Sequence, residues 1–218
     1  MDRYLEVLRD TETSGTKETI LNAAETVFAD KGFHGATVRE IFKLADVNSG
    51  LMSYYFSSKE ELYRQCLTRR LDHLNRMFAI AVEDLLKNTN GNPSPKDICF
   101  TRIYFFLSLV TKEELGLRNY IKLLGQTTSV YEDYDFEEIM EAFRPILETT
   151  IDLLQQALPF ADREKLRSNF YYFEACEITM IRGDEFRRLR FGDISDEESL
   201  VAVSEKMAQF FSRGIMLF

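Results

Sequence analysis

Apolar residues recur at helical spacing along most of the 218-residue chain. Over residues 16–32 they fall at i, i+3, i+4, i+7 and i+8, which gathers Ile20, Ala24 and Phe28 on one face of a predicted helix. Thr16 is the expected N-cap of this helix. Because the strict apolar–polar alternation of a half-buried strand is missing from the sequence, we predict an all-α fold.

Two shorter helical patterns follow the first. Val38 and Ile41 belong to a helix whose expected N-cap is Thr37, and Asp46 is the expected turn residue, which tolerates a left-handed backbone. Residues 48–56 form the third predicted helix. Three short helices with a tight turn between the second and third are what a helix-turn-helix module requires.

The rest of the chain predicts longer helices. Residues 58–88 are expected to form one continuous helix, opened by a capping box of Ser58 and Glu61. Residues 88–97, rich in Asn, Gly and Pro, are the expected linker. Further helices are predicted to begin at Ser94–Pro95 and after Thr111, and to cover 135–157, 162–183 and, after a break at 183–194 and a cap at Ser195, 196–213.

These patterns divide the chain into three parts, with about nine helices in all. Residues 1–15 are an N-terminal extension, 16–62 a three-helix helix-turn-helix unit, and 63–218 a larger C-terminal helical domain. Arg3 and Arg9 could make the extension a DNA-binding arm, but its acidic balance favours an extension that frays or packs on the protein itself.

The net charge of −9 is unevenly distributed. Residues 16–70 carry eight Lys or Arg against seven Asp or Glu, whereas residues 71–218 carry 17 against 25. Phosphate should be repelled by the acidic C-terminal part. DNA binding is therefore expected only at residues 16–62.

Several classes of protein are not indicated. No run reaches the roughly 18 apolar residues of a membrane span, and the acidic N-terminus is unlike a signal peptide, so we expect a cytoplasmic protein without a membrane partner. Cys66, Cys99 and Cys176 lie far apart, and His34 and His73 lack ligand spacing, so neither a disulfide nor a metal site is expected. We found no nucleophile–base pair, paired catalytic carboxylates or phosphate loop, so neither an enzyme nor a cofactor is predicted.

The third predicted helix has the composition of a DNA-reading element. Its apolar residues Val47, Leu51, Met52 and Phe56 are expected to face inward, and Gly50 to let the backbone approach DNA closely. Hydroxyl and amide groups can bond to base edges or phosphates, and cations to phosphates. The candidate DNA-binding residues are Thr37, Arg39, Asn48, Ser49, Gly50, Ser53, Tyr54, Tyr55 and Lys59.

The stretch ILNAAETVFADKGFHGATVREIFKLADVNSGLMSYYFSSKEEL, residues 20–62, resembles the N-terminal signature of TetR-family transcriptional repressors. The resemblance implies a homodimer that binds a palindromic operator on double-stranded DNA and is released by a small-molecule effector in the C-terminal domain. Four positions depart from the family pattern. Asp46 replaces a glycine in the turn, Ser53 replaces a tyrosine that commonly contacts phosphate, Met52 replaces a leucine, and Phe42 replaces an alanine.

Effector contacts are expected among the aromatic and acidic residues of the C-terminal domain, since ligand sites in bundles lie between helices. The candidates are Phe105, Tyr120, Phe170, Phe173, Glu174 and Glu177. The two glutamates lie in an apolar helix and need partners, which could be Arg182, a cationic ligand, or a dimer-interface ion pair with Arg182 or Arg187.

The two C-terminal helices, 162–183 and 196–213, are apolar round much of their surfaces, which suits pairing with the same helices of a second subunit. A second class of protein stays open, a dimeric helical interaction protein that has lost DNA binding. The overall acidity and Ser53 would fit it, and the loss of steep salt dependence would mark it.

Overall fold

The computed structural model describes residues 1–9, 15–126, 137–182 and 184–215. Within these ranges the chain forms helices and turns without a strand, which confirms the all-α prediction. The helices are α1 (Asp2–Arg9), α2 (Thr16–Gly35), α3 (Val38–Leu44), η1 (Ser49–Leu51), α4 (Met52–Tyr55), α5 (Lys59–Thr68), α6 (Leu71–Asn88), α7 (Pro95–Thr111), η2 (Glu113–Leu115), α8 (Arg118–Gln126), α9 (Glu137–Ala157), α10 (Arg163–Arg182), α11 (Asp184–Phe191) and α12 (Glu197–Ile215). Positions 135, 136 and 183 of the expected helices lie outside the described residues.

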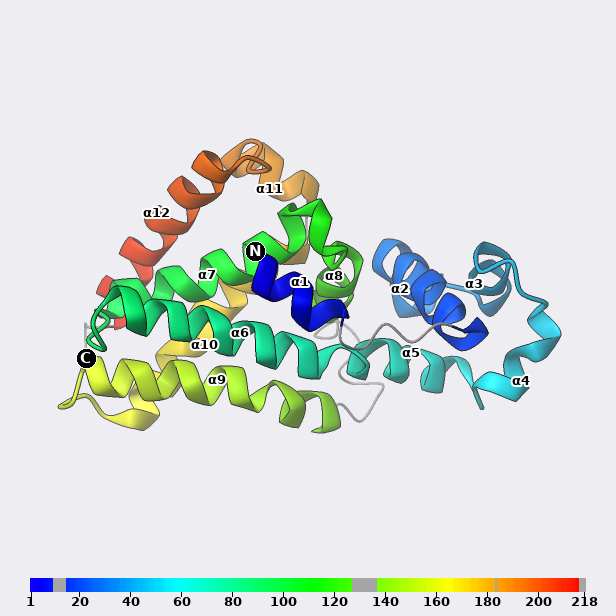
Figure 1. The fold of residues 1–218 in the computed structure, drawn as a ribbon, viewed down its shortest axis with the longest axis horizontal. Helices are drawn as coiled ribbons and strands as arrows, with labels where there is room; N and C mark the ends of the chain where they lie inside the picture. The colour runs from blue at the N-terminus through cyan, green and yellow to red at the C-terminus, as the bar shows by residue number, and fades with distance from the viewer. Residues whose placement is uncertain (10–14, 127–136, 183, 216–218) are drawn as a thin grey trace.

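The molecule is elongated, with α2, α3 and α4 at one end of its long axis (Figure 1). We call residues 16–62 the head and the described residues from 63 onward the body. In the body, α7 packs against α6, α8, α9, α10 and α12, so it is the central helix. Helix α8 packs against α2 as well as α7 and α10, which ties the head to the body.

The head is built round the apolar stripe that the sequence predicted. Ile20, Ala24 and Phe28 of α2 are fully buried, as are Ile41 and Phe42 of α3. Burial of each isoleucine or phenylalanine side chain contributes about 1.5–3 kcal/mol to the stability of the fold. This shared burial stabilises α3 and α4, which with seven and four residues are too short to be stable alone in water.

The continuous helix expected over residues 58–88 is wrong. Helix α5 ends at Thr68 and α6 begins at Leu71, with Arg69 and Arg70 between them. Ser58 is the N-cap of α5 as predicted, because its hydroxyl oxygen accepts a hydrogen bond from the Glu61 amide at 3.2 Å. The other half of the predicted capping box is replaced by bonds from Arg64 and Gln65 to the Glu61 carboxylate.

Contacts with α2 explain the break between α5 and α6. The guanidinium of Arg69 donates to Glu18 and Glu25 at 2.7 Å each and to Asn22 at 2.8 Å, and that of Arg70 donates to Glu25 at 3.1 Å. Glu25 is buried, so the two arginines supply the positive charge that a buried carboxylate requires. Residues this distant in sequence leave no trace in helical periodicity.

The N-terminal extension packs on the body, and Arg3 is part of that contact. Helix α1 lies against α6, with Val7 buried, and Arg3 forms ion pairs with Glu83 and Asp84. The alternative of a DNA-binding arm through Arg3 is therefore not supported by this arrangement.

Helix α10 ends at Arg182, where the sequence predicted a break, but the stretch that follows is not without structure. Residues 184–191 form α11, which is followed by Gly192 with a left-handed φ of 79°. The cap of α12 is Asp196 rather than Ser195, since the Asp196 carboxylate accepts from the Ser199 amide at 2.8 Å. An aspartate is an equally good N-cap, which the sequence pattern could not separate from its neighbour.

Two threonines expected to start helices do not. Thr16 is the first helical residue and Gly15 stands at the N-cap, while Thr111 ends α7 instead of opening the next helix. The Thr111 hydroxyl donates to the Leu107 carbonyl at 2.8 Å inside α7. By contrast, Ser94 and Asp97 form the capping box that opens α7, as predicted.

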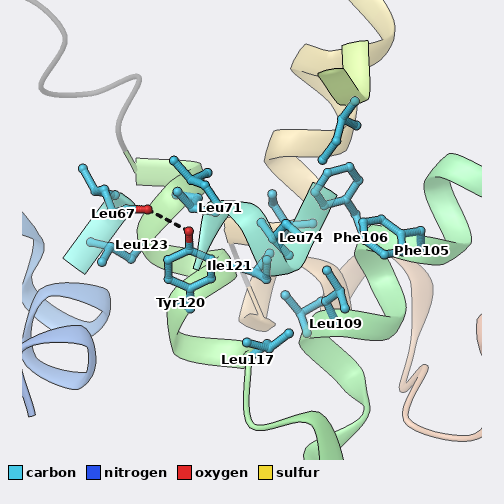
Figure 2. Close-up of a cluster of buried hydrophobic side chains, with 14 of the residues drawn as sticks. Leu67, Leu71, Leu74, Phe105, Phe106, Leu109, Leu117, Tyr120, Ile121 and Leu123 are labelled. Atoms are coloured by element: carbon cyan, nitrogen blue, oxygen red, sulfur yellow. Dashed lines mark hydrogen bonds between the residues drawn. The ribbon is translucent and has the colours of Figure 1, made fainter. Parts of the chain in front are cut away.

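The core between head and body gathers around Tyr120 of α8 (Figure 2). Its hydroxyl donates to the carbonyl oxygen of Leu67, in the last turn of α5, at 2.7 Å. Leucine and isoleucine side chains, including Leu71, Leu74 and Ile121, surround it. The tyrosine hydroxyl therefore supplies a donor to one of the carbonyls that a helix end leaves without an intrahelical partner. None of the described helices is long and apolar enough to cross a bilayer.

Candidate DNA-binding surface and internal cavity

Helix α3 begins with a complete capping box. The Thr37 hydroxyl oxygen accepts from the Glu40 amide at 3.2 Å, and the Glu40 carboxylate accepts from the Thr37 amide at 3.1 Å. Lys31 donates to the same carboxylate at 2.6 Å. Bonds from Lys31 and Thr37 lower the pKa of Glu40 to about 2, so the box is charged at neutral pH.

The turn after α3 has the geometry of a Schellman motif. The amide of Val47 donates to the Phe42 carbonyl at 3.0 Å and that of Asp46 to the Lys43 carbonyl at 3.2 Å. Asp46 has φ of 54°, the left-handed conformation expected of the residue that replaces a glycine. Aspartate thus closes the turn without loss of its hydrogen bonds.

Residues 48–56, expected as one helix, form a 3-10 turn followed by the short helix α4. Asn48 caps this segment, because its side-chain oxygen accepts from the Gly50 amide at 2.8 Å. Phe56, at the other end, is 2% exposed and anchors the segment to the head core. The backbone of the segment is therefore fixed at both ends.

Gly50 has an intramolecular reason to be a glycine. A Cβ placed there would lie 3.1 Å from the Asn48 side-chain oxygen, tighter than an ordinary van der Waals contact. The cap and the glycine therefore depend on each other. The close approach to DNA expected at Gly50 stays a prediction, and its exposed position is compatible with it.

The outer face of this segment is exposed at Ser49, Ser53 and Tyr54, and the Tyr54 side chain is 78% exposed. Tyr55 is half-buried and meets the Tyr54 ring edge to face at 4.8 Å. Leu51 was expected to face inward, which is wrong, since it is 42% exposed. The 3-10 turn rotates it away from the helical position assumed from the sequence.

The cations flanking this face differ in their contacts. Arg39 of α3 is exposed. The Lys59 ammonium, at the start of α5, lies 4.4 Å from the centroid of the Phe33 ring, and burial lowers the pKa of Lys59. Lys17 lies over the Phe56 ring on α2's side, at 5.7 Å. Lys59 therefore sits beside the exposed segment, held by an aromatic face.

The body contains a cavity of about 390 Å³ between α7, α8, α9 and α10. This volume is within the usual range of small-molecule sites. Its apolar walls come from all four helices and consist of Phe106, Ile121, Leu124, Phe143, Ile146, Leu147, Ile178 and Ile181. Its polar lining consists of Arg102, Arg144, Glu148, Arg167, Tyr171, Glu174 and Glu177.

Arg102, in the middle of α7, is the centre of a buried polar cluster in this cavity. Its guanidinium donates to Glu174 at 2.8 Å, to Glu177 at 3.2 Å and to the Thr150 hydroxyl at 3.4 Å. Its Cζ lies 4.8 Å from the Phe170 ring centroid. Burial raises the pKa of Glu177 to about 7, against the opposing effect of Arg102.

Comparison with known proteins identifies the two halves of this architecture. Residues 20–66 match the family model for bacterial regulatory proteins of the tetR family, and residues 99–214 match that for the tetracyclin repressor-like C-terminal domain. The chain belongs to the TetR family.

Individual relatives of this TetR-family chain are distant. It is 27% identical over 107 residues to the biofilm operon icaADBC HTH-type negative transcriptional regulator IcaR of Staphylococcus aureus, a match over 49% of this chain and 53% of that protein. A TetR-like regulator from Rhodococcus sp. RHA1 has a TM-score of 0.59 at 18% identity, covering 95% of this chain and all of that one. FadR from Bacillus subtilis, solved with stearoyl-CoA, has a TM-score of 0.52 at 17% identity over 90% of this chain and 98% of that one.

The candidate effector residues are separated by the TetR-family body into two groups. Glu174 and Glu177 line the cavity. Phe105, Tyr120, Phe170 and Phe173 are fully buried in the core and are not among the lining residues. Aromatic residues at helical spacing are more often core than pocket lining, and their spacing alone does not show which of them face a cavity.

Among the described contacts, the cation that pairs with the two glutamates is Arg102. Arg187 instead donates to the Met180 carbonyl at 2.8 Å, and the side chain of Arg182 lies outside the described residues. An arginine inside the apolar run of α7 was the available signal, because a buried charge requires a partner. Arg102 was nevertheless missed among the candidates predicted from the sequence.

Proposed function

We propose that this protein is a homodimeric transcriptional repressor that binds a palindromic operator with its head and leaves it when a small molecule occupies the body. The observation that carries the proposal is the exposed face of Ser49, Gly50, Ser53 and Tyr54, on a segment fixed by the Asn48 cap and the Phe56 anchor. A short polar element with a rigid backbone suits insertion in a major groove. The relative named as a negative regulator supports repression as the outcome.

Charge supports contact through the head alone. Arg39 and Lys59 flank the exposed face, where cations can contact phosphates. Residues 71–218 carry 17 basic against 25 acidic residues, so the body is repelled by DNA. This uneven distribution of charge favours an orientation with the head toward the duplex.

The dimer is proposed to form through α10 and α12. On α10, Tyr172, Ala175, Cys176 and Thr179 are exposed at i, i+3, i+4 and i+7, which makes one weakly polar stripe. On α12, Phe210 is 73% exposed. Helices with such faces can pair with their copies about a two-fold axis, which a palindromic operator mirrors.

Helix α8 is the proposed route from cavity to head. Its Ile121 and Leu124 line the cavity, while its Asn119 and Gln126 donate to Thr26 and to the Ala29 carbonyl of α2 at 3.3 and 2.8 Å. A ligand that displaces α8 would move α2 and, with it, residues 48–56, the segment proposed to enter the major groove. The effect requires that the ligand bind the two states with different affinity.

The first experiment is selection of bound sequences from random double-stranded DNA, followed by fluorescence anisotropy at several salt concentrations. An enriched inverted repeat with a steep salt slope is expected. Ser49→Ala should change the preferred bases, whereas Lys43→Ala, a control on the exposed surface of α3, should keep them. A pool without enrichment would contradict operator reading and favour the alternative of a protein-interaction dimer.

The dimer is tested by sedimentation velocity of the full chain. Tyr172→Glu combined with Phe210→Glu should convert the dimer to a monomer, because charges would be buried in the interface. Tyr54→Glu, an equally exposed aromatic in the head, is the matched control and should stay dimeric. Monomeric wild-type protein at micromolar concentration would refute the proposed assembly.

A further inference from the structure

The inner end of the cavity holds a carboxylate oxygen without a partner. Glu177 is 5% exposed, and its Oε2 accepts from Arg102, but its Oε1 is buried and makes no hydrogen bond with any described residue. A buried acceptor left in this state costs about 1–3 kcal/mol, and more when it is charged. Glu177 is also a lining residue, so this unsatisfied acceptor belongs to the wall of the cavity.

Arg102 has little left to offer a ligand. Each of its three nitrogens already donates, to Glu174, Glu177 or Thr150. Its Cζ lies 4.8 Å and 5.3 Å from the Phe170 and Phe106 ring centroids. The polar atom of the cluster that is left without a partner is therefore an acceptor, Oε1 of Glu177.

The charges of the cluster favour a positively charged ligand group. One guanidinium faces the two carboxylates of Glu174 and Glu177, so the ionised cluster carries an excess negative charge. The other cations of the lining, Arg144 and Arg167, are engaged by acids outside this cluster, at Glu141 and Glu148. A negative group at the inner end would meet two carboxylates, whereas a positive group would balance them.

We propose that the cavity binds an apolar compound carrying one protonated amine, whose N–H donates to Oε1 of Glu177. The apolar part lies against Phe106, Ile121, Ile178 and Ile181. The charge-assisted hydrogen bond supplies the missing partner and the missing positive charge together. This inference rests on the proposed function only for its regulatory meaning; the binding itself is independent of DNA.

The test is a panel of matched compounds in which one apolar body carries an amine, a hydroxyl or a carboxylate. Adamantyl, naphthylmethyl and hexyl series supply three body shapes, and binding is measured by calorimetry and thermal shift on the full chain. Within at least one series the amine is expected to bind at least about tenfold more tightly than the alcohol, since a hydrogen bond to a charged group is the stronger. If no amine binds better than its alcohol and carboxylate counterparts, including the case in which nothing binds, the proposal is overturned.

Glu177→Gln separates charge from shape, because the amide keeps a carbonyl oxygen and removes the negative charge. It should reduce amine affinity at least about tenfold and leave the alcohol within about twofold. Glu164→Gln, on the same helix with an 82% exposed side chain, is the matched control and should bind like the wild type. An unchanged amine preference in Glu177→Gln would overturn the role of this carboxylate.

A pH profile of the unmodified protein gives a readout that does not depend on a folded variant. The titratable and charged groups facing Glu177 are Arg102 and Cys99 of α7, Arg144 and Glu148 of α9, and Glu174, Arg167 and Tyr171 of α10. Burial raises the pKa of Cys99 to about 12, and the hydrogen bond from Arg167 lowers the pKa of Glu148. Burial raises the pKa of Glu177 to about 7, so Glu177 is the carboxyl expected to ionise between pH 6 and 8. Amine affinity should rise about tenfold over this range, as the cluster loses its proton, while alcohol affinity stays level or falls. Amine affinity that falls with rising pH would contradict binding to the carboxylate.

The same amine is then added to the operator complex to separate this inference from the proposed function. Binding with release of DNA supports both. Binding without release keeps the ligand class and removes its regulatory role. Release by an alcohol or carboxylate that binds better than the amine keeps the switch and overturns the ligand class.

Discussion

The polar side chains of the head and of the body find their hydrogen-bond partners in different ways. In the head, the caps of α3 and of the 3-10 turn join residues two or three positions apart, Thr37 with Glu40 and Asn48 with Gly50, and both caps are exposed. In the body, Arg102 joins residues 48 to 75 positions away, and the cluster is buried. Losing one of these caps leaves a polar group exposed to solvent, whereas losing Arg102 leaves carboxylates in the core without their cation.

This difference suits the roles proposed for the two regions. A surface that meets many DNA sequences needs exposed donors and acceptors on a fixed backbone, each of small energetic weight. A cavity that recognises one class of compound needs a buried polar group whose satisfaction depends on the ligand. Substitutions at matched positions should therefore have very different effects on stability.

The largest effect is expected from Arg102→Met, which keeps the volume of the side chain but leaves Glu174 and Glu177 without their cation. The free energy of unfolding should fall by about 3–5 kcal/mol, measured by urea denaturation at pH 7.5. Arg144→Met, at a 61% exposed side chain, should cost less than about 1 kcal/mol. Equal losses in the two variants would remove the distinction between buried and exposed charge.

The next effect is a pH dependence confined to the body. Burial raises the pKa of Glu177 from 4.5 to about 7, so the folded state holds this proton more tightly than the unfolded state. The wild type should therefore lose stability relative to Glu177→Gln as pH rises from about 4.5 to 7, by up to about 3 kcal/mol, and keep that difference above pH 7. Denaturation of both proteins at several pH values measures it. A constant difference over this range would mean that Glu177 titrates normally.

A smaller effect is expected in the head from Thr37→Ala, which removes the capping box of α3. Loss of an N-cap costs about 1 kcal/mol. Ser53→Ala, an exposed head residue outside any cap, should be within about 0.5 kcal/mol of the wild type in the same urea titration. A larger loss for Ser53→Ala than for Thr37→Ala would show that the local caps do not determine the stability of the head.

The smallest effect on stability is expected from Lys59→Ala, since its contact with the Phe33 ring is worth about 0.5–1 kcal/mol. Its effect on DNA should be distinct: weaker binding to all sequences, with the salt slope reduced by about one. Lys43→Ala is the control with an exposed cation on α3. If the two variants reduce the salt slope equally, the proposed contact between Lys59 and a DNA phosphate is contradicted.

Much of the head could be predicted from local signals in the sequence. The caps at Thr37 and Ser58, the left-handed Asp46 and the stripe of Ile20, Ala24 and Phe28 all depend on residues within one or two turns. The inward direction assigned to Leu51 failed because a 3-10 turn has a different angular step from an α-helix.

What the sequence by itself determined is the helical class, the position of the helix-turn-helix unit and the polar outer face of its third element, because these depend on periodicity and on neighbours a few residues away. Only the tertiary structure decided that Arg69 and Arg70 donate to Glu25 of α2. It also decided that Tyr120 donates to the Leu67 carbonyl and that Arg102 donates to the Glu177 carboxylate. The physical reason is that a buried charge or carbonyl must find a partner wherever the packing of distant helices brings one, and that meeting has no periodicity in the chain.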